Sequence, residues 1–192
     1  KKIFKLFLTK TWKHYLNDNF QIRPHKGAPA VEPLVTTQWT QETYYNTYCP
    51  TNSEASFETM DGRTPVGCVA LTMANILYYY RYPAHGYGIV SYIPKEYDND
   101  GHLVYTYPVQ TVNYSTATYD YDAIANSLDE YDGELAKLIY HCGVSNRMSY
   151  GPTGSGCQSE DALSAMQDHY YFNQNAQFQK KTDVVIADSL LY

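Results

Sequence analysis

Residues 61–83, DGRTPVGCVALTMANILYYYRYP, contain the clearest helix signal in the chain. Steps of three and four residues separate the apolar side chains Val69, Met73, Ile76, Leu77 and Tyr80. This is the spacing of one buried helical face. A proline disfavours helical backbone at the residue before it, so the helix must end before Pro83. The pattern predicts a helix that begins near Cys68, runs through Tyr80 and is terminated by Pro83.

Cys68 would stand in the first turn of this helix, directly after a glycine. Backbone N–H groups of the first turn have no partner within the helix, and the helix dipole favours negative charge there. Both effects stabilise the thiolate, which is the nucleophilic form of cysteine. We therefore expect a candidate nucleophile at the start of the helix. Taken alone, a buried structural thiol is the commoner role for a cysteine.

The other three cysteines are Cys49, Cys142 and Cys157. One or two disulfides of a secreted protein, or simply buried thiols, would explain them. The sequence has no C-x-x-C pair and no His–Cys group with zinc-like spacing, so we predict no metal site. The cluster Asp98–Gly101 lacks the spaced ligands and the closing Glu of a calcium loop. No cofactor motif is present either: residues 151–156 resemble a phosphate-binding loop only superficially, without its Lys.

The chain from residue 34 to 192 is predicted to be a mixed α+β domain. Strands at 89–94 and 103–107 flank the turn cluster Asp98–Gly101, a combination typical of a hairpin. Further helices are expected at 121–130, 133–142 and 160–170, and a last one opens at Thr182. Gly143 and Ser159 fit the preferences of helix C-caps and N-caps.

Residues 1–33 are predicted to be a separate leader or linker. A candidate helix around Trp12 to Leu16 is followed by the helix breakers Pro24, Gly27, Pro29 and Pro33. The segment begins like a secretion signal, but Lys5 and Lys10 interrupt its apolar run and no small-residue cleavage site follows.

Composition excludes several classes of protein. Hydrophobic residues make up 44% of the 192 residues and charged residues 18%, which indicates a globular chain. A net charge of −6 gives no basic surface for nucleic acid. No stretch approaches 18 uninterrupted apolar residues, so no transmembrane segment is expected. The 22 tyrosines favour an amphipathic, adhesive surface, and with it a secreted or cell-surface protein.

Several motifs occur in a defined order along the chain. TQWTQ at 37–41 and Cys49-Pro50 come before the DGRTPVGCVA segment at 61–70, and YDYD at 119–122 and YGPTGSG at 150–156 follow it. Together they resemble the streptopain family of papain-like cysteine peptidases, over about residues 35–172. Ordered motifs of this kind are far more specific than a single Gly-Cys pair.

The resemblance implies a role for three residues. Cys68 corresponds to the nucleophile, and Gln41 to the glutamine whose side-chain amide helps to form the oxyanion hole. One such donor is typically worth about 3 kcal/mol of the reaction barrier. With a one-residue gap, Ser155 corresponds to a serine that contacts substrate. The alternatives are a solvated amide at a strand edge for Gln41 and an ordinary surface turn for Ser155.

The catalytic histidine of the family has no counterpart in this sequence. In the family it follows a glycine in a strand of the carboxy-terminal half. None of the six histidines here stands in such a context: His14, His25, His85, His102, His141 and His169. We therefore expect a papain-like fold made mainly of the helical, cysteine-bearing lobe, with Cys68 at the buried start of its central helix. The strand-rich histidine lobe is expected to be absent from this chain.

Three explanations remain for the missing histidine: a separate carboxy-terminal chain after cleavage, a fragment, or a non-catalytic relative. Retention of both Cys68 and Gln41 favours the first two. The resemblance then implies a secreted cysteine endopeptidase made as a zymogen, acting on proteins or peptides through an acyl-enzyme. Residues 1–33 would be a prodomain remnant and 34–192 the amino-terminal part of the peptidase domain. The alternative is a catalytically inactive papain-like binding or adhesion module with a tyrosine-rich surface.

Overall fold

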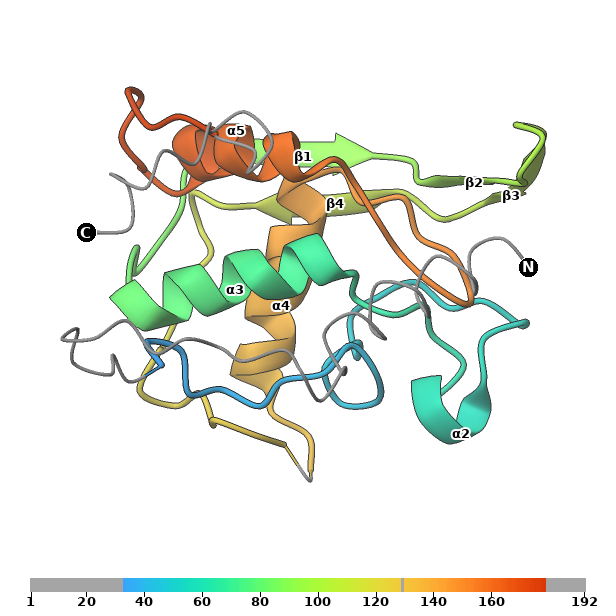
Figure 1. The fold of residues 1–192 in the computed structure, drawn as a ribbon, viewed down its shortest axis with the longest axis horizontal. Coiled ribbons are helices and arrows are strands. Elements are labelled where there is room, and N and C mark those ends of the chain that lie inside the picture. The colour runs from blue at the N-terminus through green and yellow to red at the C-terminus, as the bar shows by residue number, and fades with distance from the viewer. Residues whose placement is uncertain (1–32, 129, 179–192) are drawn as a thin grey trace, which may run out of the picture. The chain divides into compact units, whose positions relative to one another are not determined.

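The computed structural model describes residues 33–128 and 130–178, which Figure 1 shows in colour. These residues form an α+β domain of helices and two short strand pairs, as predicted. The predicted helices near Trp12 and at Thr182 lie outside the described residues, as does nearly all of the predicted leader. Within the described part of the chain, no helix is long and apolar enough to cross a bilayer.

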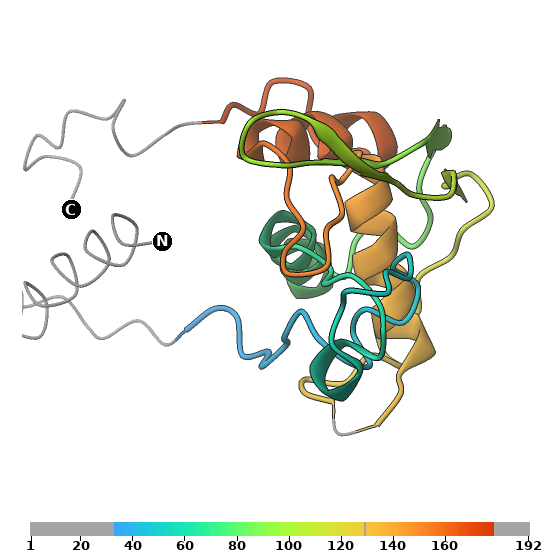
Figure 2. The ribbon, with the colours of Figure 1, turned by 90° about the vertical axis from the view of Figure 1, so that its right-hand side faces the viewer.

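The core is built on two helices that cross, α3 (Cys68–Tyr80) and α4 (Gly133–Ser145) (Figures 1 and 2). Fully or nearly fully buried side chains of both helices fill the space between them, among them Met73, Leu77, Leu135, Leu138 and Ile139. Each large apolar side chain buried in this way contributes roughly 1.5–3 kcal/mol.

The predicted bounds of α3 are confirmed, but its predicted buried face is partly wrong. Ala70, Met73, Ala74 and Leu77 are its buried residues, whereas Tyr80 is 64% exposed. Val69 and Ile76 are half-buried, and the buried face includes the small side chains of Ala70 and Ala74 instead.

Helix α4 begins as expected but ends later than predicted. The Asp132 carboxylate accepts a hydrogen bond from the Leu135 N–H at 3.0 Å, which caps the first turn. Gly143 does not end the helix. A Cβ atom at this position would lie 3.0 Å from the Tyr150 hydroxyl, so the glycine permits close packing inside the helix instead.

Helix α5 (Ser159–His169) is confirmed to within one residue at each end. Its N-cap residue is Gln158, whose side chain makes no capping hydrogen bond, rather than the predicted Ser159. The short helix α2 (Phe57–Met60), capped by the Ser56 hydroxyl, was not predicted.

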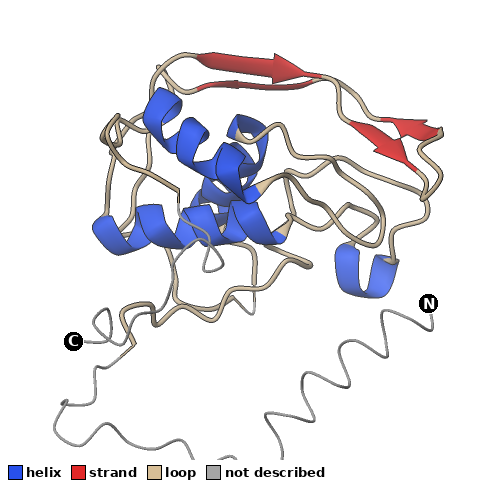
Figure 3. Ribbon diagram, turned by 45° about the horizontal axis from the view of Figure 1, so that its top comes forward, coloured by secondary structure: helices blue, strands red, loops and turns tan. Residues whose placement is uncertain are grey.

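The strands form one long hairpin that is interrupted in the middle (Figure 3). The strand pairs are antiparallel: β1 (Ile89–Tyr92) with β4 (Gln110–Asn113), and β2 (Lys95–Tyr97) with β3 (Leu103–Thr106). The turn at Asp98–Gly101 is confirmed, but β3 pairs with β2 and not with the predicted strand at 89–94, and neither β2 nor β4 was predicted. One side chain of β1, Val90, and its partner Val112 are buried, whereas all of β3 is exposed.

The predicted helix at 121–130 is wrong. An Asp120 carboxylate oxygen accepts hydrogen bonds from the N–H groups of Asp122 and Ala123, which forms a turn in place of a helix start. Further along, the backbone bonds a distant segment instead of its own next turn: the Asn126 carbonyl accepts the Gln38 N–H at 2.7 Å. This segment is therefore a loop to which residues near Trp39 attach.

Candidate active site

Cys68 is the first residue of α3 and is exposed, in contrast to the buried position that we expected. The first turn has no side-chain cap, because Gly67 occupies the N-cap position. The first backbone bond joins the Leu71 N–H to the Gly67 carbonyl at 3.1 Å. Among the described residues, the N–H groups of Cys68, Val69 and Ala70 have no acceptor. An open, electropositive helix start therefore adjoins an accessible thiol.

Gly67 is the point where α3 meets a distant loop. Its φ of +86° lies in the region that favours glycine. A Cβ atom here would lie 2.9 Å from the Ser155 carbonyl oxygen and 2.9 Å from the Met148 side chain. Only a residue without a side chain allows this approach, so Gly67 determines the surroundings of Cys68.

Gln41 is half-buried and is attached to the segment that leads into α3. Its backbone carbonyl accepts the Val66 N–H at 3.2 Å. The same stretch is anchored by Trp39, whose indole N–H donates to the Ala125 carbonyl at 2.9 Å and whose ring packs against Tyr78. The sequence motif around Gln41 is thus held beside the residues just before Cys68.

Ser155 lies in a loop that closes on itself and contacts Gly67. Two hydrogen bonds between the backbones of Ser149 and Gly156, 2.9 and 3.0 Å long, close the loop. The Ser155 hydroxyl is buried and has no partner among the described residues. The three predicted site residues thus belong to segments that meet at residues 66–68.

An apolar groove of about 480 Å³ begins at Cys68 and runs between α3 and α5. Val69, Met73 and Ile76 line it from α3, and Leu163 and Met166 line it from α5. Half-burial of Val69 and Ile76 is explained by this groove: the predicted apolar stripe lies partly in the core and partly along the groove wall.

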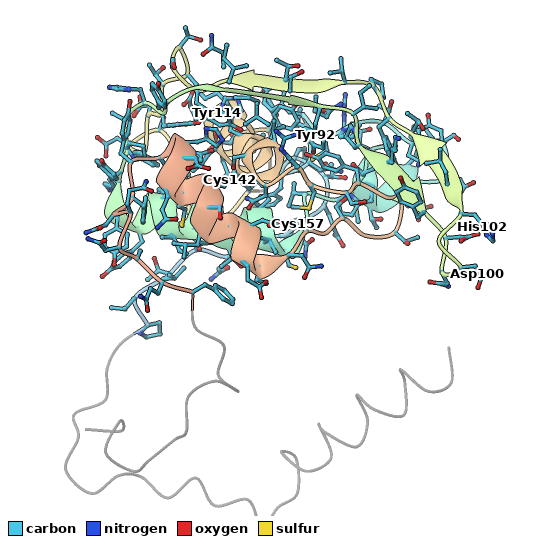
Figure 4. All side chains as sticks on the ribbon, turned by 90° about the horizontal axis from the view of Figure 1, so that it is seen from above. Tyr92, Asp100, His102, Tyr114, Cys142 and Cys157 are labelled. Carbon is cyan, nitrogen blue, oxygen red and sulfur yellow. The ribbon has the colours of Figure 1, made fainter. Side chains whose placement is uncertain are left out.

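The other three cysteines differ from Cys68 in burial, and all four are unpaired. Burial raises the pKa of Cys49 to about 12, and it also raises that of Cys142. Cys157 is half-buried at the beginning of α5 (Figure 4), and burial, with the Asp161 charge, raises its pKa to about 11. The shifts make the thiolate form of these three groups scarce at neutral pH.

The described histidines form their hydrogen bonds with groups other than Cys68. The His141 ring bonds the Tyr119 hydroxyl at 3.0 Å, and burial lowers its pKa to about 4. His169 bonds the Tyr87 carbonyl, His102 faces Asp98, and His85 contacts the Gly86 carbonyl. Within residues 33–128 and 130–178, no histidine contacts Cys68.

The tip of the β2–β3 hairpin is the one place in the described residues where three potential metal ligands gather. Ligand atoms of Asp98, Asp100 and His102 all lie within 4.8 Å of one another. Figure 4 labels Asp100 and His102 at this tip. All three residues are exposed, and Asp98 accepts two backbone N–H groups of the turn, which lower its pKa. From the sequence, we considered Asp98–Gly101 as a calcium loop without including the neighbouring His102 in it. The arrangement is that of a stabilised turn.

A second cavity, of about 780 Å³, lies beside α5 and was not predicted from the sequence. We call it the acidic cavity; the polar residues that matter below are Asn146, Arg147, Asp161, Asp168 and His169. The spacing of Asp161, Ser164 and Asp168 places all three on one face of a helix, which is the signal that could have indicated it.

The sequence and the structure of this chain were compared with those of known proteins. Residues 39–190 match the model of the Peptidase C10 family. The active wild-type interpain A cysteine protease of Prevotella intermedia is a similar solved structure, with 28% identity and a TM-score of 0.59, over 73% of this chain and 55% of that one. A prointerpain A fragment from the same organism, in which a cysteine is mutated to alanine, gives 26% identity and a TM-score of 0.62, over 87% and 54%.

The chain spans about half of the length of these solved structures. A search of the curated proteins found no match. The likeness in structure confirms the predicted fold, the helical part of a papain-like cysteine protease. The family match extends over most of the chain, and it includes Trp39, Cys68 and the loop of Ser155. This chain belongs to the Peptidase C10 family.

Proposed function

We propose that the chain is the nucleophile-bearing part of a cysteine endopeptidase, with Cys68 as the nucleophile. The observation that carries this proposal is the exposed thiol at the uncapped start of α3, where the segments of Gln41 and Ser155 meet. The Cys68 thiolate attacks a peptide carbonyl carbon, the leaving amine departs with a proton, and an acyl-enzyme thioester remains.

The negative charge that develops on the carbonyl oxygen needs donors. The free N–H of Cys68 supplies one, and the side-chain amide of Gln41 is proposed as the second. Donors aimed at this oxygen act only when charge develops, so they lower the barrier rather than tighten binding. Ser155 is proposed to contact the substrate beside them.

The proton chemistry requires a base that the described residues do not place near Cys68. We propose that a histidine from a carboxy-terminal half of the enzyme supplies it, either in the same chain or in a separate one. The apolar groove supports this, because an exposed apolar surface of this kind marks a contact site. Residues 1–33 are proposed to end a prodomain, and the tyrosine-rich composition supports a secreted or cell-surface location.

A labelling experiment tests the nucleophile. A thiol-directed epoxide should label Cys68 at neutral pH at least about tenfold faster than any other cysteine, since burial suppresses the other thiolates. Cys68→Ala should abolish the fast reaction, and Cys157→Ala, the matched control at the other partly accessible cysteine, should leave it intact. Slow labelling spread over several cysteines would favour the binding module, for which exposed tyrosines such as Tyr80, Tyr82 and Tyr87 provide the surface.

The missing base is tested separately. The 192-residue chain alone should not hydrolyse casein, and addition of the carboxy-terminal half of the enzyme should restore hydrolysis. Cys68-dependent hydrolysis by the chain alone would mean that one of its own six histidines is the base.

A further inference from the structure

The acidic cavity and the apolar groove lie on two faces of the same helix. Asp161, Ala165 and Asp168 of α5 line the cavity, whereas Ala162 and Met166 line the groove that begins at Cys68. Steps of three and four residues keep each set on its own face. The cavity is therefore lined by charged side chains of α5 and the groove by its apolar side chains, although only this helix separates them.

The polar groups of the cavity are mainly unpaired acceptors. The Asp161 and Asp168 carboxylates are exposed, and neither has a hydrogen-bond or ion-pair partner among the described residues. The His169 Nδ1 atom faces the Tyr87 carbonyl at 3.0 Å and must donate to it, which leaves Nε2 as an acceptor in the neutral ring. Arg147 supplies one positive charge against the two carboxylates.

Asn146 provides an independent indication of a ligand. This residue lines the cavity, is only 4% exposed, and its side-chain N–H donates to the Cys142 carbonyl at 2.6 Å. Its side-chain oxygen is buried and has no donor among the described residues. A buried acceptor without a partner is costly, so a ligand that brings N–H groups into the cavity would satisfy it.

The cavity is also connected to the proposed active site by a short piece of chain. Gly156 and Cys157 line the cavity, and Ser155, just before them, contacts Gly67 at the start of α3. A peptide with its carbonyl carbon at Cys68 that extended over residues 155–157 would advance by roughly 3.3 Å per residue, so the experiment below places the charged side chain at several distances from the reacting carbonyl.

We propose that the acidic cavity is a substrate subsite that binds a positively charged side chain, lysine or arginine, of a peptide whose reacting carbonyl lies at Cys68. The proposal rests on the proposed function. Ammonium and guanidinium groups carry only donors, and they match a site that offers two carboxylates, the Asn146 oxygen and the His169 ring nitrogen. Arg147 reduces the negative charge without cancelling it, so the expected preference is modest.

Peptidyl chloromethyl ketones test the subsite on the 192-residue chain, with the rate of Cys68 alkylation measured by mass spectrometry. Lysine or its uncharged analogue norleucine is placed in turn two, three and four residues before the reactive carbonyl. At one position the lysine reagent should react about fivefold faster, the range of an exposed ion pair. Salt at about 0.5 M should reduce this advantage.

Charge-removing variants assign the preference to the cavity. Asp161→Asn and Asp168→Asn should each reduce the lysine advantage, whereas Asp100→Asn, which removes an exposed carboxylate at the distant hairpin tip (Figure 4), should leave it unchanged. Equal rates for lysine and norleucine at every position would overturn the proposal, and so would an advantage that survives in both cavity variants. The epoxide experiment separates the two proposals: selective labelling of Cys68 together with equal rates for lysine and norleucine overturns the subsite alone, whereas loss of selective labelling overturns the proposed function itself.

Discussion

The two ends of α3 are built in opposite ways. At its carboxy-terminal end, Arg81 adopts a left-handed conformation, and its N–H bonds the carbonyls of Leu77 and Tyr78. The Arg81 guanidinium lies over the Tyr78 ring and pairs with Asp122 at 2.6 Å. At the amino-terminal end the N-cap is a glycine, and three N–H groups have no acceptor among the described residues.

We call the amino-terminal end of α3, with its unpaired N–H groups, the open end, and the capped carboxy-terminal end the closed end. The contrast shows that the surroundings of a helix end determine whether it is capped. At the closed end, the backbone of Arg81 satisfies carbonyl groups of the last turn of the same helix. At the open end, the loop that contains Ser155 contacts Gly67, which is the N-cap residue. Unpaired donors cost stability unless water or a ligand reaches them. Their presence beside the exposed Cys68 is what distinguishes the proposed reactive end from the opposite end of the helix.

The strongest way to break the open end is Gly67→Ala. The new Cβ atom would collide with the Ser155 carbonyl and the Met148 side chain at a backbone conformation that alanine disfavours. We expect a loss of about 4 kcal/mol in the free energy of unfolding, measured by urea denaturation. Gly154→Ala is the control, because nothing lies within 4 Å of its Cβ position. Equal losses in the two variants would show that the approach at Gly67 has no special importance.

Gln41→Ala should sharpen the comparison, because it removes a proposed donor from the open end without disturbing the helix. In an enzyme completed with its carboxy-terminal half, kcat should fall about a hundredfold while KM changes little. The neighbouring exposed Thr40→Ala is the control. A change confined to KM would identify Gln41 as a binding residue instead.

Acid should act on the tyrosine cluster that supports the closed end, in which Tyr121 donates to the Pro83 carbonyl and Tyr119 bonds His141. Burial holds the pKa of His141 at about 4, below its ordinary 6.5, so the unfolded chain takes up this proton first as the pH falls. Stability from this group is complete above pH 6.5 and declines down to pH 4, by about 3 kcal/mol.

Urea denaturation across this pH range measures the effect of His141. His141→Gln should flatten that part of the profile, while the exposed His102→Gln should not. An unchanged slope in His141→Gln would assign the acid sensitivity to other groups.

The smallest effect is expected at the ion pair of the closed end. Asp122→Asn removes the partner of Arg81, but both side chains are at least half exposed, and exposed pairs contribute little. We expect a change below about 0.5 kcal/mol in the free energy of unfolding. A loss above about 1 kcal/mol would mean that the closed end depends on this charge and not on its backbone bonds.

Local sequence signals predicted some parts of the fold and not others. The bounds of α3 followed from apolar spacing and from Pro83, both of which act within a few residues. The helix predicted at 121–130 was wrong because the Asp120 side chain competes for the backbone N–H groups that a helix start needs. Strand β4 was missed because Val112 is its only apolar residue and its pairing with Val90 is non-local.

The candidate site shows the same division. Cys68, Gln41 and Ser155 could be named from motifs, and the structure brings their segments together. The exposure of Cys68 could not be predicted, because a first-turn position says nothing about which loops cover it. Asn146 and the aspartates of the acidic cavity were missed for a related reason: the cavity joins the end of α4 to one face of α5, and no single stretch of sequence contains it.

The close approach at Gly67 also has a consequence for the order in which the molecule folds. Ser155 lies far later in the chain than Gly67, so their contact closes a long loop and has a high entropic cost. The hydrogen bonds of helix α3 are local, whereas the contact between Gly67 and Ser155 can form only after the chain has reached Gly156 and the loop has closed. We therefore expect the proposed substrate-contacting loop to be added to the start of α3 late in folding, so that the proposed nucleophile is present in the chain before the rest of its proposed site.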